Sequence, residues 1–168
     1  MLELRVVTYR YPGAARPSIA GIDLAIEAGE VVGVAGPNDA GKSTLCLVAS
    51  GLAPASVGGE LTGMVMLGGT TTAGRRPHEL AGLAGIVFQD SAAQRSGITG
   101  TVFEEVALGP VNLGLPVSES IARSRAVLLT LGIEALAERH PARLSGGQAQ
   151  LVGIAAILAL RPRCLVRD

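Results

Sequence analysis

The sequence predicts an α/β fold that begins with an antiparallel β lobe. Segments 2–6 and 22–26 alternate apolar and polar residues, as half-buried antiparallel strands do. The run Val31-Val32-Gly33-Val34-Ala35 is continuously apolar, which is typical of a parallel strand buried on both faces. Helical and strand patterns alternate along the rest of the chain, and this alternation places the fold in the α/β class.

Boundary signals define the later elements. Ser118 and Ser145 are expected to act as N-caps, because a serine hydroxyl can accept a hydrogen bond from a backbone N–H of the first helical turn. Gly51 and Gly132 are expected to end helices. The elements expected after the apolar run are a helix over 42–50, a hairpin around 61–67, a strand over 85–89, helices over 102–108, 119–131 and 145–160, and a buried strand from 164 to 166.

Length and charge limit the functions that this chain can have. Its 168 residues suit about one domain with a substantial core. Fourteen Lys and Arg balance 14 Asp and Glu, so the formal net charge is zero. Because no positive field surrounds such a chain, nucleic acid is not expected as a partner.

The hydropathy pattern predicts a cytoplasmic domain that does not span a membrane itself. Hydrophobic residues make up 48% of the chain, yet the longest apolar stretch, Leu151 to Leu160, runs ten residues and includes Gly153. A spanning helix needs about 20 residues. The N-terminus lacks the pattern of a secretory signal. We therefore expect a cytoplasmic domain that can dock on a membrane partner.

A glycine-rich loop lies between the apolar run and the first expected helix. Gly36-Pro37-Asn38-Asp39-Ala40-Gly41-Lys42-Ser43-Thr44 fits the pattern G-x-x-x-x-G-K-[ST]. In such a loop successive backbone N–H groups point at phosphate oxygens, and the helix N-terminus adds positive potential. Lys42 is placed to reach the β- and γ-phosphates, and the Ser43 hydroxyl to bind Mg²⁺. A glycine-rich turn with a chance lysine is the alternative, and the flanking elements disfavour it.

A second glycine-rich segment opens the expected helix over 145–160. Its sequence is Leu144-Ser145-Gly146-Gly147-Gln148. Taken alone, this pentapeptide is also compatible with an ordinary serine-capped helix. Its position about a hundred residues after the phosphate loop favours a second anion cradle.

Together, in this order and spacing, the two segments resemble the nucleotide-binding subunit of ATP-binding-cassette (ABC) proteins. The resemblance covers essentially the whole chain. It implies a P-loop NTPase fold of the ABC ATPase type, with an antiparallel β lobe and a helical subdomain over about 90–145. It also implies ATP and Mg²⁺ as ligands. Two ATPase domains would pair head to tail, and Ser145 with the amides of Gly146 and Gly147 would bind the γ-phosphate of ATP held by the opposite domain.

Three further residues match positions of known function in the family. Tyr11 matches the aromatic residue that stacks on adenine, and Gln89 matches the Q-loop glutamine that contacts Mg²⁺ or the attacking water. Asp168 matches the Walker B carboxylate that holds Mg²⁺. The resemblance thus assigns catalytic roles to Lys42, Gln89 and Asp168 and metal binding to Ser43, Gln89 and Asp168. The implied nucleotide-binding residues are Tyr11, Gly36, Pro37, Asn38, Asp39, Ala40, Gly41, Lys42, Ser43, Thr44, Ser145, Gly146, Gly147 and Gln148.

The chain departs from the family pattern at two positions close to these motifs. Asp39 replaces a glycine; aspartate tolerates a left-handed conformation better than most residues, so we expect binding to survive with a weaker affinity unless the carboxylate points outward. Arg167 replaces the apolar residue expected before Asp168, which weakens the sequence pattern for the last strand.

The last residue of the sequence also bears on catalysis. In the family a glutamate that polarises the attacking water comes directly after the position of Asp168, and a switch histidine follows further on. Neither His78 nor His140 lies at that histidine's position. General-base positioning is worth roughly 10²- to 10⁴-fold in rate. The 168-residue chain, which we interpret as an incomplete domain, is therefore expected to bind ATP far better than it hydrolyses it.

The segment Thr99 to Pro116 indicates a branch of the family. Its sequence, TGTVFEEVALGPVNLGLP, is similar to the helical subdomain of energy-coupling-factor (ECF) importers, whose ATPases drive uptake of vitamins, their precursors, cobalt or nickel. The resemblance implies an ATP-hydrolysing subunit at the cytoplasmic face of the cell membrane. Its partners would be a second ATPase domain, identical, paralogous or fused, and a transmembrane transporter subunit.

Two other functions remain open at this point. One is a soluble ABC ATPase without a transport role, which basic surfaces or long coiled-coil insertions would favour. The other is a nucleotide-binding fragment that does not hydrolyse ATP. The sequence does not identify the solute.

Overall fold

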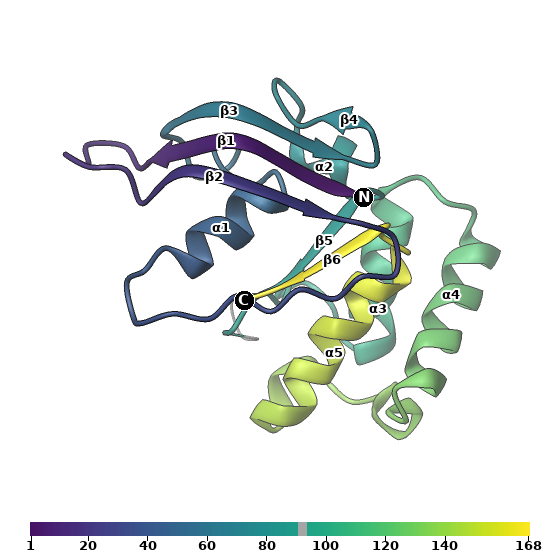
Figure 1. Ribbon diagram of the computed structural model, residues 1–168. Coiled ribbons are helices and arrows are strands. Elements are labelled where there is room, and N and C mark those ends of the chain that lie inside the picture. Colours follow the sequence, from purple (N-terminus) through teal and green to yellow (C-terminus); the bar gives the residue numbers. More distant parts are fainter. Residues whose placement is uncertain (91–93) are drawn as a thin grey trace. The chain divides into compact units, whose positions relative to one another are not determined.

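The computed structural model describes residues 1–90 and 94–168 (Figure 1). The chain forms two compact units, one made of Met1–Ile86 with Arg163–Asp168, the other of Val87–Pro162. The first unit holds β1 (Leu2–Arg10), β2 (Ile19–Ile26), α1 (Lys42–Ala49), β3 (Glu60–Leu67), β4 (Thr70–Thr71), α2 (Pro77–Leu80), most of β5 (Ala84–Val87) and β6 (Cys164–Arg167). The second holds α3 (Val102–Asn112), α4 (Val117–Thr130), α5 (Gly146–Ala159) and the short 3-10 turns η1 (Glu134–Leu136) and η2 (Pro141–Arg143).

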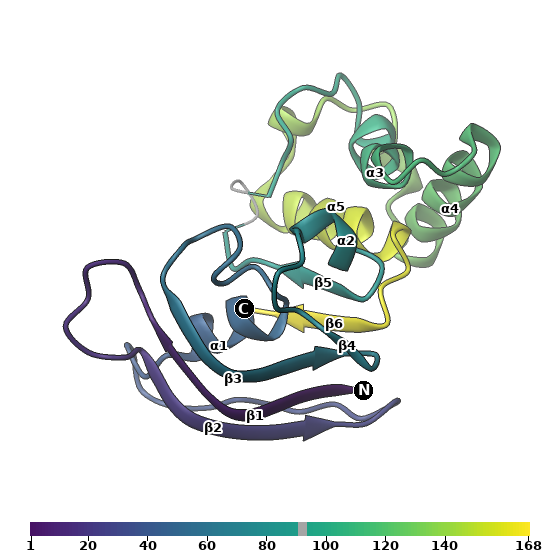
Figure 2. The ribbon, with the colours of Figure 1, turned by 90° about the horizontal axis from the view of Figure 1, so that it is seen from above.

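The antiparallel lobe of the first unit is confirmed. Its four strands lie in the order β2-β1-β3-β4, and β1 pairs with both β2 and β3 in antiparallel register. Leu4 lies opposite Leu24 on one side and Val65 on the other. Helix α1 lies against one face of this sheet (Figures 1 and 2). Its Val48 joins the buried residues of β1 and β3 in one hydrophobic core.

The alternation expected at the start of β1 is correct up to Arg5 and wrong at Val6. Leu2 and Leu4 are buried, whereas Val6 is 64% exposed and has a φ of 48°. A bulge at this position shifts the register, so that Val7 continues the buried face. The Val6 N–H donates at 2.8 Å to the side-chain oxygen Oδ1 of Asp23 on β2, and not to a backbone carbonyl of that strand.

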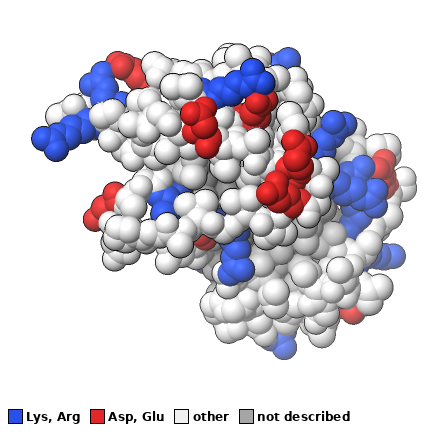
Figure 3. Space-filling view, in the orientation of Figure 1, with Lys and Arg blue, Asp and Glu red and all other residues white. Residues whose placement is uncertain are grey.

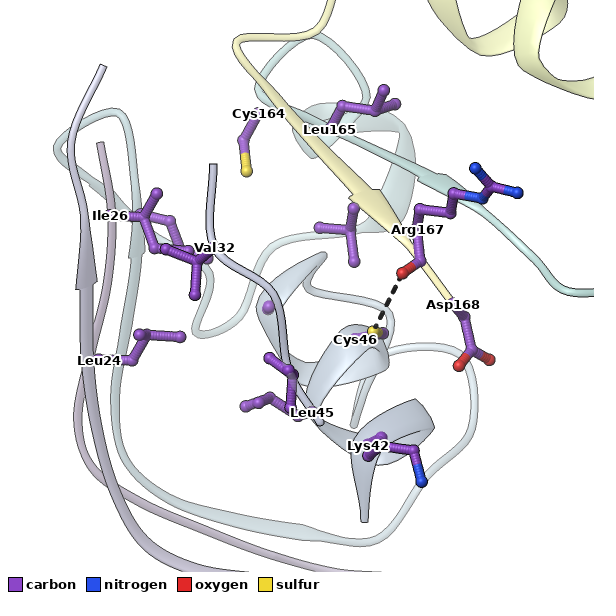
Figure 4. A pocket seen from close by; sticks show the side chains of 14 residues that line it. Leu24, Ile26, Val32, Lys42, Leu45, Cys46, Cys164, Leu165, Arg167 and Asp168 are labelled. Carbon is purple, nitrogen blue, oxygen red and sulfur yellow. Dashed lines mark hydrogen bonds between the residues drawn. The ribbon is translucent and has the colours of Figure 1, made fainter. Parts of the chain in front are cut away.

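The strand expected over Val31 to Ala35 is not formed. Val31 is 95% exposed and Val34 51% exposed, and no strand is assigned to this segment of the described chain. An apolar groove of about 240 Å³ separates Val32 and Val34 from strand β6 (Figure 4). A parallel strand requires backbone hydrogen bonds from a neighbour. In the described part of the chain β6 pairs only with β5, so residues 31–35 have no partner strand and the expected strand does not form.

The last strand, β6, is present but only half buried. It pairs with β5 in a two-stranded sheet, and the arrows of the two strands point in the same direction in Figure 2. Cys164 and Val166 are partly buried, whereas Leu165 is 50% exposed. The expectation of a buried strand is therefore wrong, because the residues of β6 line the groove.

The helices of the second unit differ from the expectation mainly at their ends. Helix α3 continues past residue 108 through Pro110 to Asn112. A proline near the end of a helix removes little, because few turns remain to be disrupted. Helix α4 has Pro116 as N-cap, so the prediction of Ser118 is wrong; Ser118 lies inside the first turn. The expected stop at Gly132 is correct, since its φ is 66° and its N–H donates to Leu129 O.

The second unit has a core of its own. Val106, Leu128 and Val152 bring α3, α4 and α5 together. Gly109 allows α3 to approach the end of α5, because a Cβ there would lie 2.8 Å from Leu160 Cδ2. The unit also includes α5, which lies beyond the sequence-based limit of about 145 for the helical subdomain. None of the helices in the described part of the chain is long and apolar enough to cross a membrane.

Candidate functional site

The glycine-rich loop ends where helix α1 begins. Asp39 and Gly41 have φ values of 62° and 88°, and Gly41 is the N-cap of α1. A Cβ at Gly41 would lie 2.5 Å from Ser18 O and 2.9 Å from Ile19 Cγ2, so both conformation and space require glycine. The first turn of α1 carries no acidic residue. The backbone N–H groups at this helix end therefore keep their positive potential.

The Lys42 side chain folds back over the loop. Its Nζ donates to Gly36 O at 3.0 Å and to Pro37 O at 2.6 Å. Residues 36 to 40 are exposed. The ammonium group is thus held at the centre of a solvent-accessible loop of backbone amides, where a phosphate could replace the two carbonyl oxygens as its partner.

Ser43 and Asp168 meet although 125 residues separate them. The Ser43 hydroxyl donates to Asp168 Oδ1 at 2.7 Å. Strand β6 carries Asp168 to the same end of the first unit as Lys42 (Figure 4). One hydroxyl and one carboxylate oxygen are hard donors, and Mg²⁺ sites typically combine one or two carboxylates with substrate phosphates and water. This donor pair therefore fits Mg²⁺ bound together with a nucleotide.

Tyr11 lies beside the phosphate loop. Its hydroxyl is 3.2 Å from Thr44 Oγ1, and its ring packs edge-on against Tyr9 at a centroid distance of 5.0 Å. Both Tyr11 and the loop line a pocket of about 470 Å³. Pro17 and Ser18 complete this pocket, and no motif in the sequence pointed to them. Stacking of Tyr11 on adenine stays a prediction.

The second glycine-rich segment forms the N-terminus of α5 in the other unit. Ser145 Oγ accepts from the Gln148 N–H at 3.4 Å, and Gln148 Oε1 accepts from the Ser145 N–H at 3.1 Å, so the predicted cap is correct. Ser145, Gly146 and Gly147 are exposed. Apart from its chain neighbours and the backbone of its own helix, a Cβ added at either glycine would meet no atom of the described residues within 4 Å. Contacts within this chain therefore do not require glycine at these two positions.

Gln89 lies in the second unit, two residues beyond β5. It is exposed and occupies a bend. The preceding Phe88 N–H donates to Gln94 Oε1 at 3.2 Å. The catalytic and metal-binding roles assigned to Gln89 stay predictions.

The cysteines and histidines are not among the predicted site residues. Burial raises the pKa of the Cys46 thiol, with a smaller contribution from the Asp168 carboxylate, and burial likewise raises the pKa of the Cys164 thiol. Both thiols are therefore protonated and poorly reactive at neutral pH. His78 and His140 are partly or fully exposed, and the His140 ring accepts from the Ala142 N–H at 3.1 Å.

The phosphate loop and the Asp168 carboxylate beside Ser43 are typical of nucleotide-binding proteins of the P-loop class, and so is the serine-capped glycine pair of α5. This class agrees with the predicted fold. Residues 19–168 match the family described as ABC transporter. The chain therefore belongs to the ABC transporter family.

Curated relatives include import ATPases. The chain is 40% identical over 171 residues to the cobalt import ATP-binding protein CbiO of Rhodobacter capsulatus, covering all of this chain and 58% of that protein. It is also 40% identical over 171 residues to the energy-coupling factor transporter ATP-binding protein EcfA of Methanothermobacter thermautotrophicus, covering 52% of that protein. The chain thus spans little more than half the length of these two relatives.

Solved structures show the same fold. The cbiO1 protein of Clostridium perfringens, described as part of the ABC transporter complex cbiONQ, matches 99% of this chain and 64% of its own with a TM-score of 0.81 and 31% identity. The cassette MJ0796, solved as a dimer bound to ADP and Pi, matches all of this chain and 73% of its own with a TM-score of 0.83 and 28% identity.

Proposed function

We propose that this chain is the ATP-binding part of a transport ATPase, which hydrolyses ATP to power solute import across the cell membrane. The observation that carries the proposal is the meeting of Ser43 with Asp168 beside a solvent-accessible loop centred on Lys42. Ser43 and Asp168 lie 125 positions apart in the sequence. They form the donor set that a magnesium–nucleotide complex requires.

Each residue of the loop would have a defined task. Backbone N–H groups around Gly41 would hold the phosphate oxygens, and Lys42 would exchange its two carbonyl partners for the β- and γ-phosphates. Ser43 and Asp168 would hold Mg²⁺. When bound, the metal neutralises charge that develops on the transferred phosphoryl group.

The signature segment supports a paired arrangement of two domains. Gly146 and Gly147 are exposed at the N-terminus of a 14-residue helix, and among the described residues of the chain nothing outside this helix lies within 4 Å of a Cβ built on either of them. Glycines that internal packing does not require are explained by a close approach of something outside the chain. We propose that this is the γ-phosphate of ATP bound by a second ATPase domain. The dimeric structure of MJ0796 with ADP and Pi is consistent with such a pair.

The import role and the membrane location come from relatives. The names of the CbiO and EcfA proteins describe cobalt import and energy-coupling-factor transport. We propose that this chain acts at the cytoplasmic face of the membrane with a transmembrane subunit, in uptake of a vitamin, a vitamin precursor, or cobalt or nickel. Both Lys and Arg side chains and Asp and Glu side chains lie on the face shown in Figure 3.

Titration of ATP binding with a Lys42→Ala variant tests the proposal. A hydrogen bond from a charged group contributes about 1.5–3 kcal/mol, so we expect the dissociation constant of magnesium–ATP to rise about 10- to 100-fold. Arg125→Ala, which removes one exposed cation from helix α4, is the matched control and should bind like the wild type. Equal affinity of the folded Lys42→Ala variant and the wild type would contradict the proposal.

A further inference from the structure

The segment after Gln89 is anchored by a buried carboxylate. Glu105 on α3 is 7% exposed. One of its oxygens accepts from the Ser96 N–H at 2.6 Å, and the other accepts from the Ser96 hydroxyl at 2.6 Å and the Thr99 hydroxyl at 2.5 Å. Burial alone raises the pKa of Glu105, but these hydrogen bonds and the charge of Arg95 outweigh it and lower the pKa. The carboxylate is therefore ionised at neutral pH and holds residues 96–99 against α3.

Arg95 connects the same segment to the residues that precede the signature. Its Nη1 donates to Pro141 O at 3.0 Å. Pro141 is buried and begins the turn η2, only four residues before Ser145. This hydrogen bond joins parts of the chain that are 46 residues apart.

The N-terminus of α3 is also hydrogen-bonded to the segment that precedes η2. The N–H groups of Val102 and Phe103 donate to Arg139 O and Ala137 O, each at 2.9 Å. Amides of a first helical turn lack partners within their own helix. Here the segment 137–139 supplies them, so a shift of α3 would also move the polypeptide that leads to Ser145.

Gln94, which directly precedes Arg95, is hydrogen-bonded to the residue before Gln89. Gln94 Oε1 accepts from the Phe88 N–H at 3.2 Å. The same oxygen lies 3.4 Å from the position that a Cβ of Gly153 would occupy, so Gln94 also lies against α5. Contacts therefore run without a break from Phe88 through Gln94, Arg95 and Glu105 to both flanks of the signature segment.

We propose that Arg95 and Glu105 are positioning residues that couple the bend at Gln89 to the N-terminus of α5. When a nucleotide or a membrane partner displaces the bend, residues 94–99 would move with it and shift Ser145 and the two glycines through Pro141 and α3. This inference rests on the proposed function, because only a signature that binds ATP makes the coupling useful. Neither residue would touch the nucleotide.

Three variants and one control separate coupling from folding. Arg95→Leu keeps the aliphatic stem and removes the donor to Pro141 O, and Arg95→Lys restores a cationic donor. Glu105→Gln keeps the shape of the carboxylate and removes its charge. Arg125→Leu on α4 is the control for loss of an exposed guanidinium.

Amide hydrogen exchange measures the coupling directly, without a nucleotide. The reporters are the N–H groups of Gln148 and Ala149, which donate to the Ser145 side chain and to Ser145 O. A lost hydrogen bond is worth about 1 kcal/mol, so we expect exchange at both reporters to become about fivefold faster in Arg95→Leu and Glu105→Gln, with recovery in Arg95→Lys. Faster exchange confined to residues 96–99 would overturn the proposal, and so would a uniform increase over all of α3, α4 and α5.

Hydrolysis by the complete natural polypeptide supplies the functional test. The ATP dissociation constant of Arg95→Leu should stay within about twofold of the wild type, because the phosphate loop is unchanged, while kcat falls about fivefold or more. An unchanged kcat together with unchanged exchange would also overturn the coupling. A wild-type protein that binds no ATP would instead refute the proposed function, and the exchange experiment would still decide whether the coupling exists.

Discussion

Asp39 offers a sensitive test of the phosphate loop, because it adds a carboxylate where a polyanion would bind. The residue has a φ of 62°, is exposed, and lines the same pocket as Lys42, Ser43 and Tyr11. A unit charge about 6 Å from another in water contributes roughly 0.7 kcal/mol, and a triphosphate presents more than one charge. We therefore expect Asp39→Gly to tighten ATP binding by about 1–1.4 kcal/mol, or five- to tenfold.

The backbone contribution of the same substitution should nearly cancel. Glycine relieves a left-handed conformation that costs a residue with a Cβ about 1 kcal/mol, but it loses about 0.4–1 kcal/mol of entropy on folding. The free energy of unfolding should thus change by less than about 0.6 kcal/mol in a urea titration.

Asp39→Asn separates charge from conformation, since asparagine also tolerates the left-handed region. It should recover most of the gain in affinity, and the difference from the wild type should shrink as salt rises from 0.05 to about 1 M. The assay is an equilibrium titration with ATP at several ionic strengths. If both variants bind ATP no more tightly than the wild type at low salt, the carboxylate does not face the phosphates and the reasoning is refuted.

Two further predictions concern the metal and the pH. Ser43→Ala removes the donor to Asp168, so the affinity for magnesium–ATP should fall about tenfold while the affinity for ATP without Mg²⁺ changes less than twofold; Ser118→Ala on α4 is the control, and an equal loss with and without Mg²⁺ would contradict the assignment. The pKa of Glu105 is lowered in the folded protein, so its contribution to stability is present above the unfolded value and lost as the pH falls through the folded value. Urea titrations of the wild type and Glu105→Gln should therefore differ most near pH 7 and converge in acid; a constant difference would show that the carboxylate's charge is not responsible.

Local signals predicted the elements whose boundaries depend on nearby residues. Ser145 caps α5 and Gly132 ends α4 as expected, because each uses backbone groups within a few residues. Val6 failed because its bulge depends on Asp23 and on Gly63, 57 positions away, where a Cβ would lie 2.4 Å from Val6 O. Periodicity reports which side chains are apolar and carries no information about such distant partners.

The sequence predicted those site residues that belong to a motif and missed the others. The phosphate loop and Asp168 were found because their chemistry demands fixed residue types at fixed spacing, and the structure brings Ser43 and Asp168 together. Pro17 and Ser18 also line the pocket, but they belong to no recognisable residue pattern. Arg95 was missed for the same reason, because its partner is a carbonyl oxygen and any residue can supply one.

The exposed run from Val31 to Val34 also affects how the protein behaves in solution. An extended apolar segment beside an uncovered strand edge is a template on which another polypeptide can add in β-sheet fashion. At high concentration, self-association should therefore begin at this groove, and turbidity should depend on residues 31–34 more than on the charged surface. A polypeptide that occupied the groove would cover this apolar segment and thereby suppress self-association.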